Sequence, residues 1–225
     1  MAYQGHRGTI LYGLVRQALR AGELAYYQVF LGPRGRGLPV PVHTWDSQYR
    51  KGHWDIFETP DELPRYAIVA AYIRNYSVAP TILDVGCGYG RLLAELQPSS
   101  VKKYLGIDLS SEAISRAKTG DHRHVSFEVA DFTEWRTDSK FDIIVFNETL
   151  YYATYAVPLL DRYFDMLDEH GSIIVSMYRH RNTKLIWRDI GRCFAYIDSF
   201  EVKNGKGEIT DIRVLMRPGR PPHFK

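Results

Sequence analysis

Short apolar runs alternate along this chain with segments in which apolar residues recur at helical spacing. Runs bounded by turn residues predict β-strands, and the 3.6-residue period predicts amphipathic helices. We expect strands at 81–85, 103–108, 125–131, 141–147, 172–178, 199–203 and 208–216, and helices at 63–73, 92–96, 156–167 and 183–194 and after Ser110. Alternating strands and helices predict a doubly wound α/β fold whose central strands are parallel and buried.

The two ends of the chain have different patterns. The last two predicted strands flank Asn204 and Gly205, a pair typical of β-hairpins. Residues 10–19 have an amphipathic helical pattern, and residues 32–41 are rich in glycine, proline and arginine. We therefore predict three parts, which are an N-terminal helical appendage with a linker over 1–41, a single domain over 42–217 and a tail over 218–225.

The appendage has several open interpretations. Its helix packs on its own domain or is exchanged within a homodimer, or its basic side rests on a membrane surface or a partner. Arg16 and Arg20 interrupt the apolar run too early for a secretory signal peptide, and no 18-residue apolar stretch predicts a membrane span. We expect no stable membrane insertion and a cytoplasmic protein.

Composition narrows the class of protein further. The 225 residues, of which 45% are hydrophobic, are enough to bury one large core. A net charge of +3 without a long basic run argues against nucleic acid as the partner. The chain has two cysteines, which is typical of a reducing compartment and not of a disulfide scaffold.

The most informative motif lies where the first predicted strand ends. Its sequence, Asp84-Val-Gly-Cys-Gly-Tyr-Gly90, turns a buried strand into a helix, and its glycines leave the backbone open to a ligand. Arg91 stands where the dinucleotide fingerprint needs its third glycine, and the Gly-Lys-Ser/Thr of a P-loop is absent. These differences disfavour a nicotinamide-dependent oxidoreductase and a P-loop phosphate site.

Two further predicted strands also end in an acid. Asp108 follows the loop by about 20 residues, where an open α/β sheet places a carboxylate against a ribose diol. Asp131 closes the third strand. Because the carboxyl ends of parallel strands border one crevice, we expect Asp84, Asp108 and Asp131 to surround one ligand there.

With the glycine loop and the three acids in this order, residues 42–217 resemble the class I S-adenosylmethionine (SAM) methyltransferases. The resemblance implies a Rossmann-like, seven-stranded sheet that is mostly parallel with one antiparallel edge strand. It also implies that Asp131 accepts from the adenine amino group, while Leu109 and Phe132 sandwich the ring. The complete set of cofactor-binding residues that we predict is Tyr49, Trp54, Arg65, Asp84, Gly86, Cys87, Gly88, Gly90, Asp108, Leu109, Ala130, Asp131, Phe132 and Asn147.

Aromatic residues mark the segment before the core. The pattern Trp45-Asp-x-x-Tyr49-x-x-Gly-x-Trp54-Asp resembles the segment that folds over SAM in many small-molecule methyltransferases. Aromatic faces attract a sulfonium cation and exclude water from its methyl group. The alternative is that these rings only fasten a mobile segment. Arg65 would pair with the methionine carboxylate of SAM or lie at the surface.

Candidate catalytic residues follow the fourth and fifth predicted strands. Glu148 and Tyr152 come after the fourth and His180 after the fifth, so each is a candidate base beside the acceptor. The alternatives are that Glu148 holds a turn or the methionine amino group, that Tyr152 only shapes the pocket, and that His180 is a loop residue. Asn147 stands where metal-assisted catechol-type enzymes have an aspartate, and we predict no metal.

These features predict a metal-independent methyltransferase that acts by in-line displacement on a nitrogen or oxygen of a small-molecule acceptor. The cofactor would be SAM and the product S-adenosylhomocysteine (SAH). Because fold does not set function, two other classes stay open. One is a SAM-binding regulator or scaffold without turnover, and the other is a methyltransferase that its N-terminal helix targets to a membrane surface.

Overall fold

A computed structural model describes residues 37–76, 78–117, 123–180 and 182–217, together with residues 18, 19, 21, 22, 25, 26 and 29. Most of the appendage predicted over 1–41, and the tail over 218–225, lie outside the described residues. The proposals that the appendage packs on the domain, is exchanged in a homodimer or contacts a membrane therefore stay predictions. No helix in the described ranges has the length and apolar character needed to cross a bilayer.

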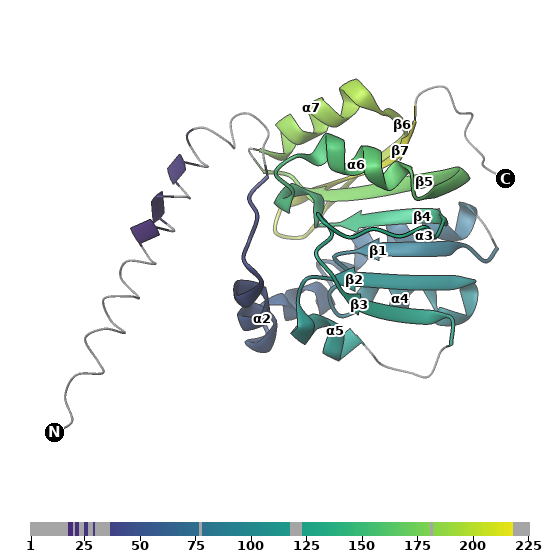
Figure 1. Ribbon diagram of the computed structural model, residues 1–225, viewed down its shortest axis with the longest axis horizontal. Helices are drawn as coiled ribbons and strands as arrows, with labels where there is room; N and C mark the ends of the chain where they lie inside the picture. Colours follow the sequence, from purple (N-terminus) through teal and green to yellow (C-terminus); the bar gives the residue numbers. More distant parts are fainter. Residues whose placement is uncertain are drawn as a thin grey trace.

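Seven strands form one sheet in the order β3-β2-β1-β4-β5-β7-β6 (Figure 1). They are β1 (Thr81–Val85), β2 (Lys103–Asp108), β3 (Val125–Val129), β4 (Phe141–Asn147), β5 (Leu167–Tyr178), β6 (Ala195–Lys203) and β7 (Ile209–Met216). Strands β1 to β5 are parallel, whereas β7 runs antiparallel to both β5 and the edge strand β6. The predicted α/β fold class, a doubly wound and mostly parallel seven-stranded sheet, is confirmed.

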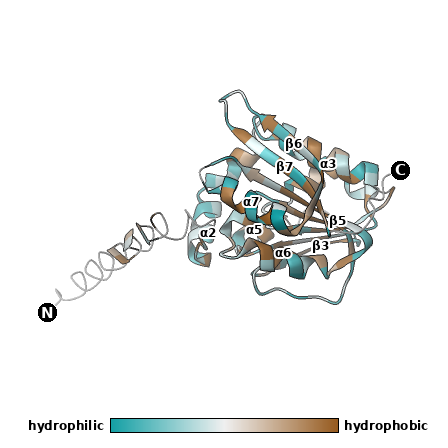
Figure 2. Ribbon diagram, turned by 90° about the horizontal axis from the view of Figure 1, so that it is seen from above, coloured by the Kyte–Doolittle hydropathy of each residue, from teal (hydrophilic) through white to brown (hydrophobic). Residues whose placement is uncertain are grey.

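Helices cover both faces of this sheet. They are α2 (Val42–Arg50), η3 (His53–Glu58), α3 (Leu63–Tyr76), α4 (Arg91–Leu96), η4 (Pro98–Ser100), α5 (Ser111–Ala117), η5 (Leu150–Tyr152), α6 (Ala156–Phe164) and α7 (Thr183–Cys193). Figures 1 and 2 show α3 on the face opposite to α6 and α7. Side chains alternate along β4 accordingly, because Ile144 and Phe146 belong to the core under α6 and α7, and Ile143 and Val145 to the core under α3 and α4.

The predicted helix over 156–167 is three residues too long, because α6 ends at Phe164. The backbone N–H of Met166 donates to the carbonyl of Tyr163 in a closing turn (3.0 Å). Strand β5 then begins at Leu167, five residues before the predicted start at Ser172, and Leu167 pairs with Phe141. Pairing with a neighbouring strand therefore overrides the local helical pattern at this point.

The predicted hairpin is confirmed, but its turn is longer than the two residues Asn204 and Gly205. The backbone N–H of Asn204 donates to the carbonyl of Glu208 at 3.0 Å. The Asn204 side-chain oxygen accepts from the backbone N–H of Lys206 and of Glu208, both at 3.0 Å. Gly207, with φ of 83°, takes the left-handed position. Asn204 therefore stabilises this longer turn through its side-chain oxygen.

Helix α2 lies across the carboxyl ends of the parallel strands (Figure 1). It is fastened to α5, because the hydroxyl of Ser110 donates to Asp46 Oδ1 at 2.6 Å and Arg50 forms an ion pair with Glu112. The same Ser110 hydroxyl accepts from the backbone N–H of Ala113 (3.3 Å) and thereby caps α5, the helix that was expected after Ser110. The segment before the core therefore covers the edge of the sheet at which the polar strand ends meet.

Candidate functional site

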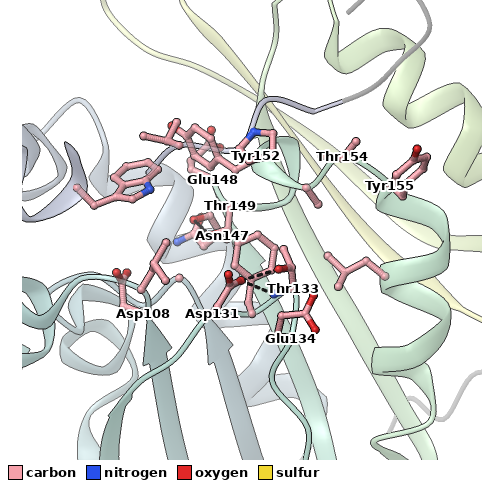
Figure 3. A pocket seen from close by; sticks show the side chains of 18 of the residues that line it. Asp108, Asp131, Thr133, Glu134, Asn147, Glu148, Thr149, Tyr152, Thr154 and Tyr155 are labelled. Atoms are coloured by element: carbon pink, nitrogen blue, oxygen red, sulfur yellow. Dashed lines mark hydrogen bonds between the residues drawn. The ribbon is translucent and has the colours of Figure 1, made fainter. Parts of the chain in front are cut away.

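A cavity of about 650 Å³ lies at the carboxyl ends of the parallel strands (Figure 3). This volume is in the range of small-molecule sites. The residues that line it are Pro39, Val40, Trp45, Tyr49, Trp54, Phe57, Gly86, Asp108, Leu109, Asp131, Phe132, Thr133, Glu134, Asn147, Glu148, Thr149, Tyr152, Ala153, Thr154, Tyr155, Pro158, Leu159 and Arg162. A second cavity of about 30 Å³ lies beside the glycine loop and is bordered by Asp84, Cys87 and Gly88 among others.

The glycine loop needs glycine for two physical reasons. Gly86 has φ of 72°, and a Cβ there would lie 2.2 Å from the Thr149 hydroxyl oxygen. That hydroxyl is held in place, because it donates to the Val85 carbonyl at 2.9 Å. Gly88 has φ of 54°, and a Cβ there would approach the Tyr49 hydroxyl at 3.2 Å. The backbone of the loop therefore packs directly against the residues that wall the cavities.

We expect Gly86→Ala to lower the free energy of unfolding by about 3 kcal/mol, since left-handed strain and an overpacked methyl group each cost of order 1–3 kcal/mol. Gly205→Ala is the matched control, because a Cβ at Gly205 would meet no atom of the described residues within 4 Å. Urea titration of the two variants measures the difference. A loss for Gly86→Ala no larger than the loss for the control would contradict this account of the loop.

Asp108 ends β2 and lines the main cavity with 8% of its surface exposed. Its Oδ2 accepts the backbone N–H of Gly88 and its Oδ1 that of Ser110, both at 2.9 Å. Burial raises the pKa of this carboxyl to about 6, although the two backbone bonds act in the opposite direction. The Tyr49 side chain also donates a hydrogen bond to Asp108. A carboxylate has about four acceptor positions, so these three donors leave part of its acceptor capacity available to a ligand.

Asp84, in β1, is more deeply buried and borders the smaller cavity. The Tyr104 hydroxyl donates to its Oδ2. Its Oδ1 is a buried acceptor without a hydrogen-bond partner in the described part of the chain. Burial raises the pKa of Asp84 to about 7. A buried acceptor of this kind favours a cationic donor from a ligand.

Asp131 lies just beyond β3, beside Asp108 on the floor of the cavity (Figure 3). Its Oδ1 accepts from the backbone N–H (2.8 Å) and from the hydroxyl (2.7 Å) of Thr133. The next residue, Phe132, has its carbonyl held by the Tyr163 hydroxyl at 2.8 Å. Helix α6 thus fixes the loop that carries Asp131 and Phe132, which line the cavity together with Leu109.

An aromatic cluster from α2, η3 and η5 covers the cavity. The ring of Trp54 lies 5.3 Å from Phe57 and 5.4 Å from Trp45, and the ring of Trp45 lies 4.8 Å from Tyr152. Tyr49 is 6% exposed and 6.1 Å from Trp54. The cluster gives the cavity a wall of aromatic faces, which suits a cationic ligand.

Glu148 follows β4 and lines the cavity. Its φ of 59° is rare for a residue with a side chain, and the surrounding contacts enforce it. Its Oε2 accepts the backbone N–H of Tyr178 at 2.8 Å, and the Ser176 hydroxyl donates to its Oε1 at 3.1 Å. Burial raises the pKa of Glu148, and a hydrogen bond from Tyr151 opposes the shift. The carboxylate is therefore preorganised and more basic than usual.

The predicted site residues fall into two groups. Those that line at least one of the two cavities are Tyr49, Trp54, Asp84, Gly86, Cys87, Gly88, Asp108, Leu109, Asp131, Phe132, Asn147, Glu148 and Tyr152. Gly90, Arg65, Ala130 and His180 line neither of these two cavities, as the described residues define them.

Arg65 and His180 lie one layer behind the cavity walls. Arg65 is 2% exposed and held by Glu62 (2.7 Å) and by the side-chain oxygen of Asn147, which itself lines the cavity. His180 lies behind Tyr151, with 5.6 Å between the two rings, and burial lowers its pKa. The direct roles predicted for them stay predictions. In the described ranges, no group of three or more His, Cys, Asp or Glu could hold a metal ion.

Several cavity residues have no sequence signal that would have identified them. Thr149 is a single hydroxyl after β4, and Leu159 and Arg162 lie on one side of α6. Pro39 and Val40 belong to the predicted linker, yet they line the cavity, and the backbone N–H of Leu38 donates to the Tyr151 carbonyl at 3.3 Å. Only contacts between distant segments reveal these residues.

Comparison with known families gives a match over residues 77–207, more than half of the chain, to a family described as "Methyltransferase domain". Nodulation protein S of Bradyrhizobium diazoefficiens is 32% identical over 128 residues, which are 55% of this chain and 56% of that protein. Trans-aconitate 2-methyltransferase of Streptomyces avermitilis is 30% identical over 146 residues, 60% of this chain and 51% of that enzyme. The chain thus spans about half the length of these relatives.

Solved structures share the fold. The N-methyltransferase NodS of Bradyrhizobium japonicum WM9, in complex with SAH, superposes with a TM-score of 0.66 at 20% identity, over 79% of this chain and 98% of that one. Magnesium protoporphyrin IX methyltransferase of Synechocystis, with bound SAH, has a TM-score of 0.61 at 14% identity, over 78% of this chain and 97% of that one. Identities this low show a common fold.

Proposed function

The chain belongs to the class I SAM-dependent methyltransferases, and from this membership we propose that it methylates an amine nitrogen of a small molecule. SAM is the cofactor of this family. The observation that carries the choice of an amine is Glu148, a preorganised carboxylate with a raised pKa that lines the same cavity as the aromatic cluster. Carboxylate and aromatic faces both attract an ammonium group and would repel or fail to pair an anionic acceptor.

The residues present fit SAM. Under the proposal, the remaining acceptor positions of Asp108 bind the ribose hydroxyls, and the unpartnered Oδ1 of Asp84 faces the cationic amino group. Leu109 and Phe132 hold the adenine between them, and Asp131 accepts from its amino group. Under the proposal, Arg65 acts through Asn147, whose side-chain oxygen it orients.

When bound, SAM supplies a methyl group on a sulfonium sulfur that is open to in-line displacement by a lone pair. The contribution of this chain is alignment, proton removal and exclusion of water. Glu148 accepts the proton that the acceptor nitrogen loses, and its two fixed oxygens keep it at one position. Tyr152 and Trp45, which lie edge to face at 4.8 Å, close the cavity over the reacting nitrogen.

The names of several relatives also support nitrogen as the acceptor atom. Besides the N-methyltransferase NodS, phosphoethanolamine N-methyltransferase 1 of Arabidopsis thaliana is 32% identical over 108 residues, 46% of this chain and 22% of that enzyme. The trans-aconitate 2-methyltransferase of Streptomyces avermitilis, by contrast, is named for a substrate that has carboxylates and no amine. The described lining of the cavity has more acidic than basic side chains, and this excess of negative charge favours an amine as the acceptor. The acidic residues are Asp108, Asp131, Glu134 and Glu148, and the basic residue is Arg162.

The test is transfer of a labelled methyl group from SAM to matched acceptors. Glucosamine and ethanolamine carry the amine, N-acetylglucosamine has the same sugar with the amine blocked, and trans-aconitate has carboxylates only. We expect product with at least one amine and none with the blocked sugar. Methylation of the carboxylates alone would refute the choice of nitrogen. Tight SAH binding without turnover on any acceptor would favour the alternative function, a SAM-binding regulator or scaffold that transfers no methyl group.

Cofactor affinity should depend on pH near neutrality. Burial raises the pKa of Asp108 to about 6 and of Asp84 to about 7, and both carboxylates must be ionised to serve the cofactor as proposed. We expect SAH binding to weaken up to tenfold per pH unit between about pH 7 and pH 6, where Asp84 must lose its proton on binding, and up to 100-fold per pH unit below about pH 6, where both acids must lose one. Calorimetry from pH 8 to pH 5 measures this, and Asp108→Asn should flatten the dependence.

The same raised pKa values affect the free energy of unfolding in the direction opposite to their effect on cofactor affinity. The folded state without cofactor holds these protons more tightly than the unfolded chain, where both acids have a pKa near 3.8. Their contribution to the free energy of unfolding therefore increases as the pH falls from about 7 towards 4. An affinity for SAH that stays constant from pH 8 to pH 5 would contradict the cofactor-binding roles proposed for Asp84 and Asp108.

A further inference from the structure

A separate cavity of about 490 Å³ lies between α7 and the β6–β7 hairpin, which are neighbours in Figure 1. It shares no lining residue with the main cavity. Five of its lining residues are cationic, and they are Arg179, Lys184, Arg188, Arg192 and Arg213. The other lining residues are Trp187, Gly191, Tyr196 and Asp211.

Lys184, Arg188 and Arg192 lie at i, i+4 spacing on α7, so their like charges face one another along a single row. Such a row is unfavourable for an isolated helix unless an anion balances it. Asp189 pairs with Arg188 (3.0 Å) and with Arg192 (3.5 Å), so one carboxylate serves two guanidinium groups. The row therefore keeps an excess of positive charge on the cavity wall.

Arg213 forms the floor of the cavity. Its guanidinium carbon lies 4.4 Å from the centre of the Trp187 ring and 4.7 Å from that of Tyr196. Gly191 permits this packing, because a Cβ there would lie 2.9 Å from the Tyr196 hydroxyl. Among the described residues, no carboxylate forms an ion pair with Arg213, in contrast to Arg179, which pairs with Asp211 and Glu201. A stacked guanidinium keeps its in-plane N–H groups available for an anion.

Trp187 supplies an independent sign of a missing ligand. Its side chain is 3% exposed, and its Nε1 is a buried donor without an acceptor in the described part of the chain. A buried N–H without a partner costs about 1–3 kcal/mol, so such groups point to an acceptor that a ligand would bring. Trp187 lines the same cavity as Arg213, which hydrogen-bonds to Tyr196 but forms no ion pair among the described residues.

We propose that this cavity is a binding site for a phosphate-bearing small molecule, separate from the methyl-transfer site. Phosphate oxygens would accept from Arg213, from the Nε1 of Trp187 and from the α7 row of Lys184 and Arg188. The volume accommodates a group the size of a mononucleotide or a sugar phosphate. The site does not depend on the nature of the methyl acceptor.

The test is calorimetric titration of SAH-saturated full-length protein with inorganic pyrophosphate and, separately, with AMP, at constant ionic strength. Saturation with SAH keeps the phosphates out of the main cavity. The test variants are Lys184→Gln/Arg188→Gln, on the exposed helix surface, and Arg213→Gln. The control is Lys102→Gln/Lys103→Gln, which removes the same charge from two exposed residues near the start of β2, outside both cavities.

We expect saturable binding of pyrophosphate that weakens at least tenfold in each test variant and stays unchanged in the control. Tighter binding of AMP than of pyrophosphate would support a nucleotide as the source of the phosphate. Equal weakening in the test and control variants, or no saturable binding, would overturn the proposal. So would binding of a single-stranded RNA oligonucleotide without binding of either small phosphate. Thermal unfolding shows whether the Arg213→Gln protein folds. If it does not fold, pyrophosphate binding by the Lys184→Gln/Arg188→Gln variant tests the proposal.

Discussion

Glu148→Gln is expected to lower the turnover number for the preferred amine about 100- to 10,000-fold, the usual contribution of a general base. Glutamine keeps the shape and the left-handed backbone of Glu148 but cannot take a proton. SAH binding should change less than threefold, because the proposed role of Glu148 concerns the acceptor. Steady-state kinetics and calorimetry on the same preparation separate the two effects.

Glu208→Gln is a suitable control, since Glu208 is exposed in the hairpin and lies outside the main cavity. The pH profile of the turnover number supplies a second readout. A base should give an acidic limb in the wild type that Glu148→Gln abolishes. If Glu148→Gln weakened SAH binding and turnover in parallel, Glu148 would hold the cofactor and the base would have to be another residue.

Asp108→Ala is expected to weaken SAH binding by roughly 10- to 150-fold, which corresponds to about 1.5–3 kcal/mol for hydrogen bonds to a charged group. The carboxylate is the acceptor at the end of β2 that borders the main cavity, and it also holds the backbone N–H groups of Gly88 and Ser110. Its removal therefore costs both the ligand contact and the order of the loop. Calorimetry with SAH measures the affinity.

Asp138→Asn is the control for this variant, because Asp138 is exposed in the loop before β4 and lies outside both cavities at the carboxyl ends of the strands. Circular dichroism shows whether Asp108→Ala folds. An unchanged affinity in a folded Asp108→Ala protein would contradict the proposed position of the cofactor. Asp108→Asn then distinguishes charge from shape, since it retains one acceptor oxygen.

The sequence predicts well those parts of this protein whose structure depends on residues that are close together in the chain. Apolar runs and turn residues predict the bounds of β1, β2 and β4 correctly, because burial on two faces of a sheet demands that pattern, whereas β5 and β6 begin five and four residues before their predicted starts. The spacing of Gly86, Gly88 and Gly90 predicts a ligand-facing loop, and all three glycines have positive φ. The end of α6 was predicted wrongly because pairing of Leu167 with Phe141 is a long-range event.

The chain order of Asp84, Asp108 and Asp131 determined the fold family and its cofactor, because parallel strands bring their carboxyl ends to one edge whatever the side-chain packing. The tertiary structure alone decided which candidates face a ligand. Glu148 lines the cavity, with its oxygens held by Ser176 and Tyr178, 28 and 30 residues later, whereas His180 packs against Tyr151 and lines neither cavity at this edge of the sheet. Such positions depend on contacts between segments that are distant in the chain, and no local pattern encodes them.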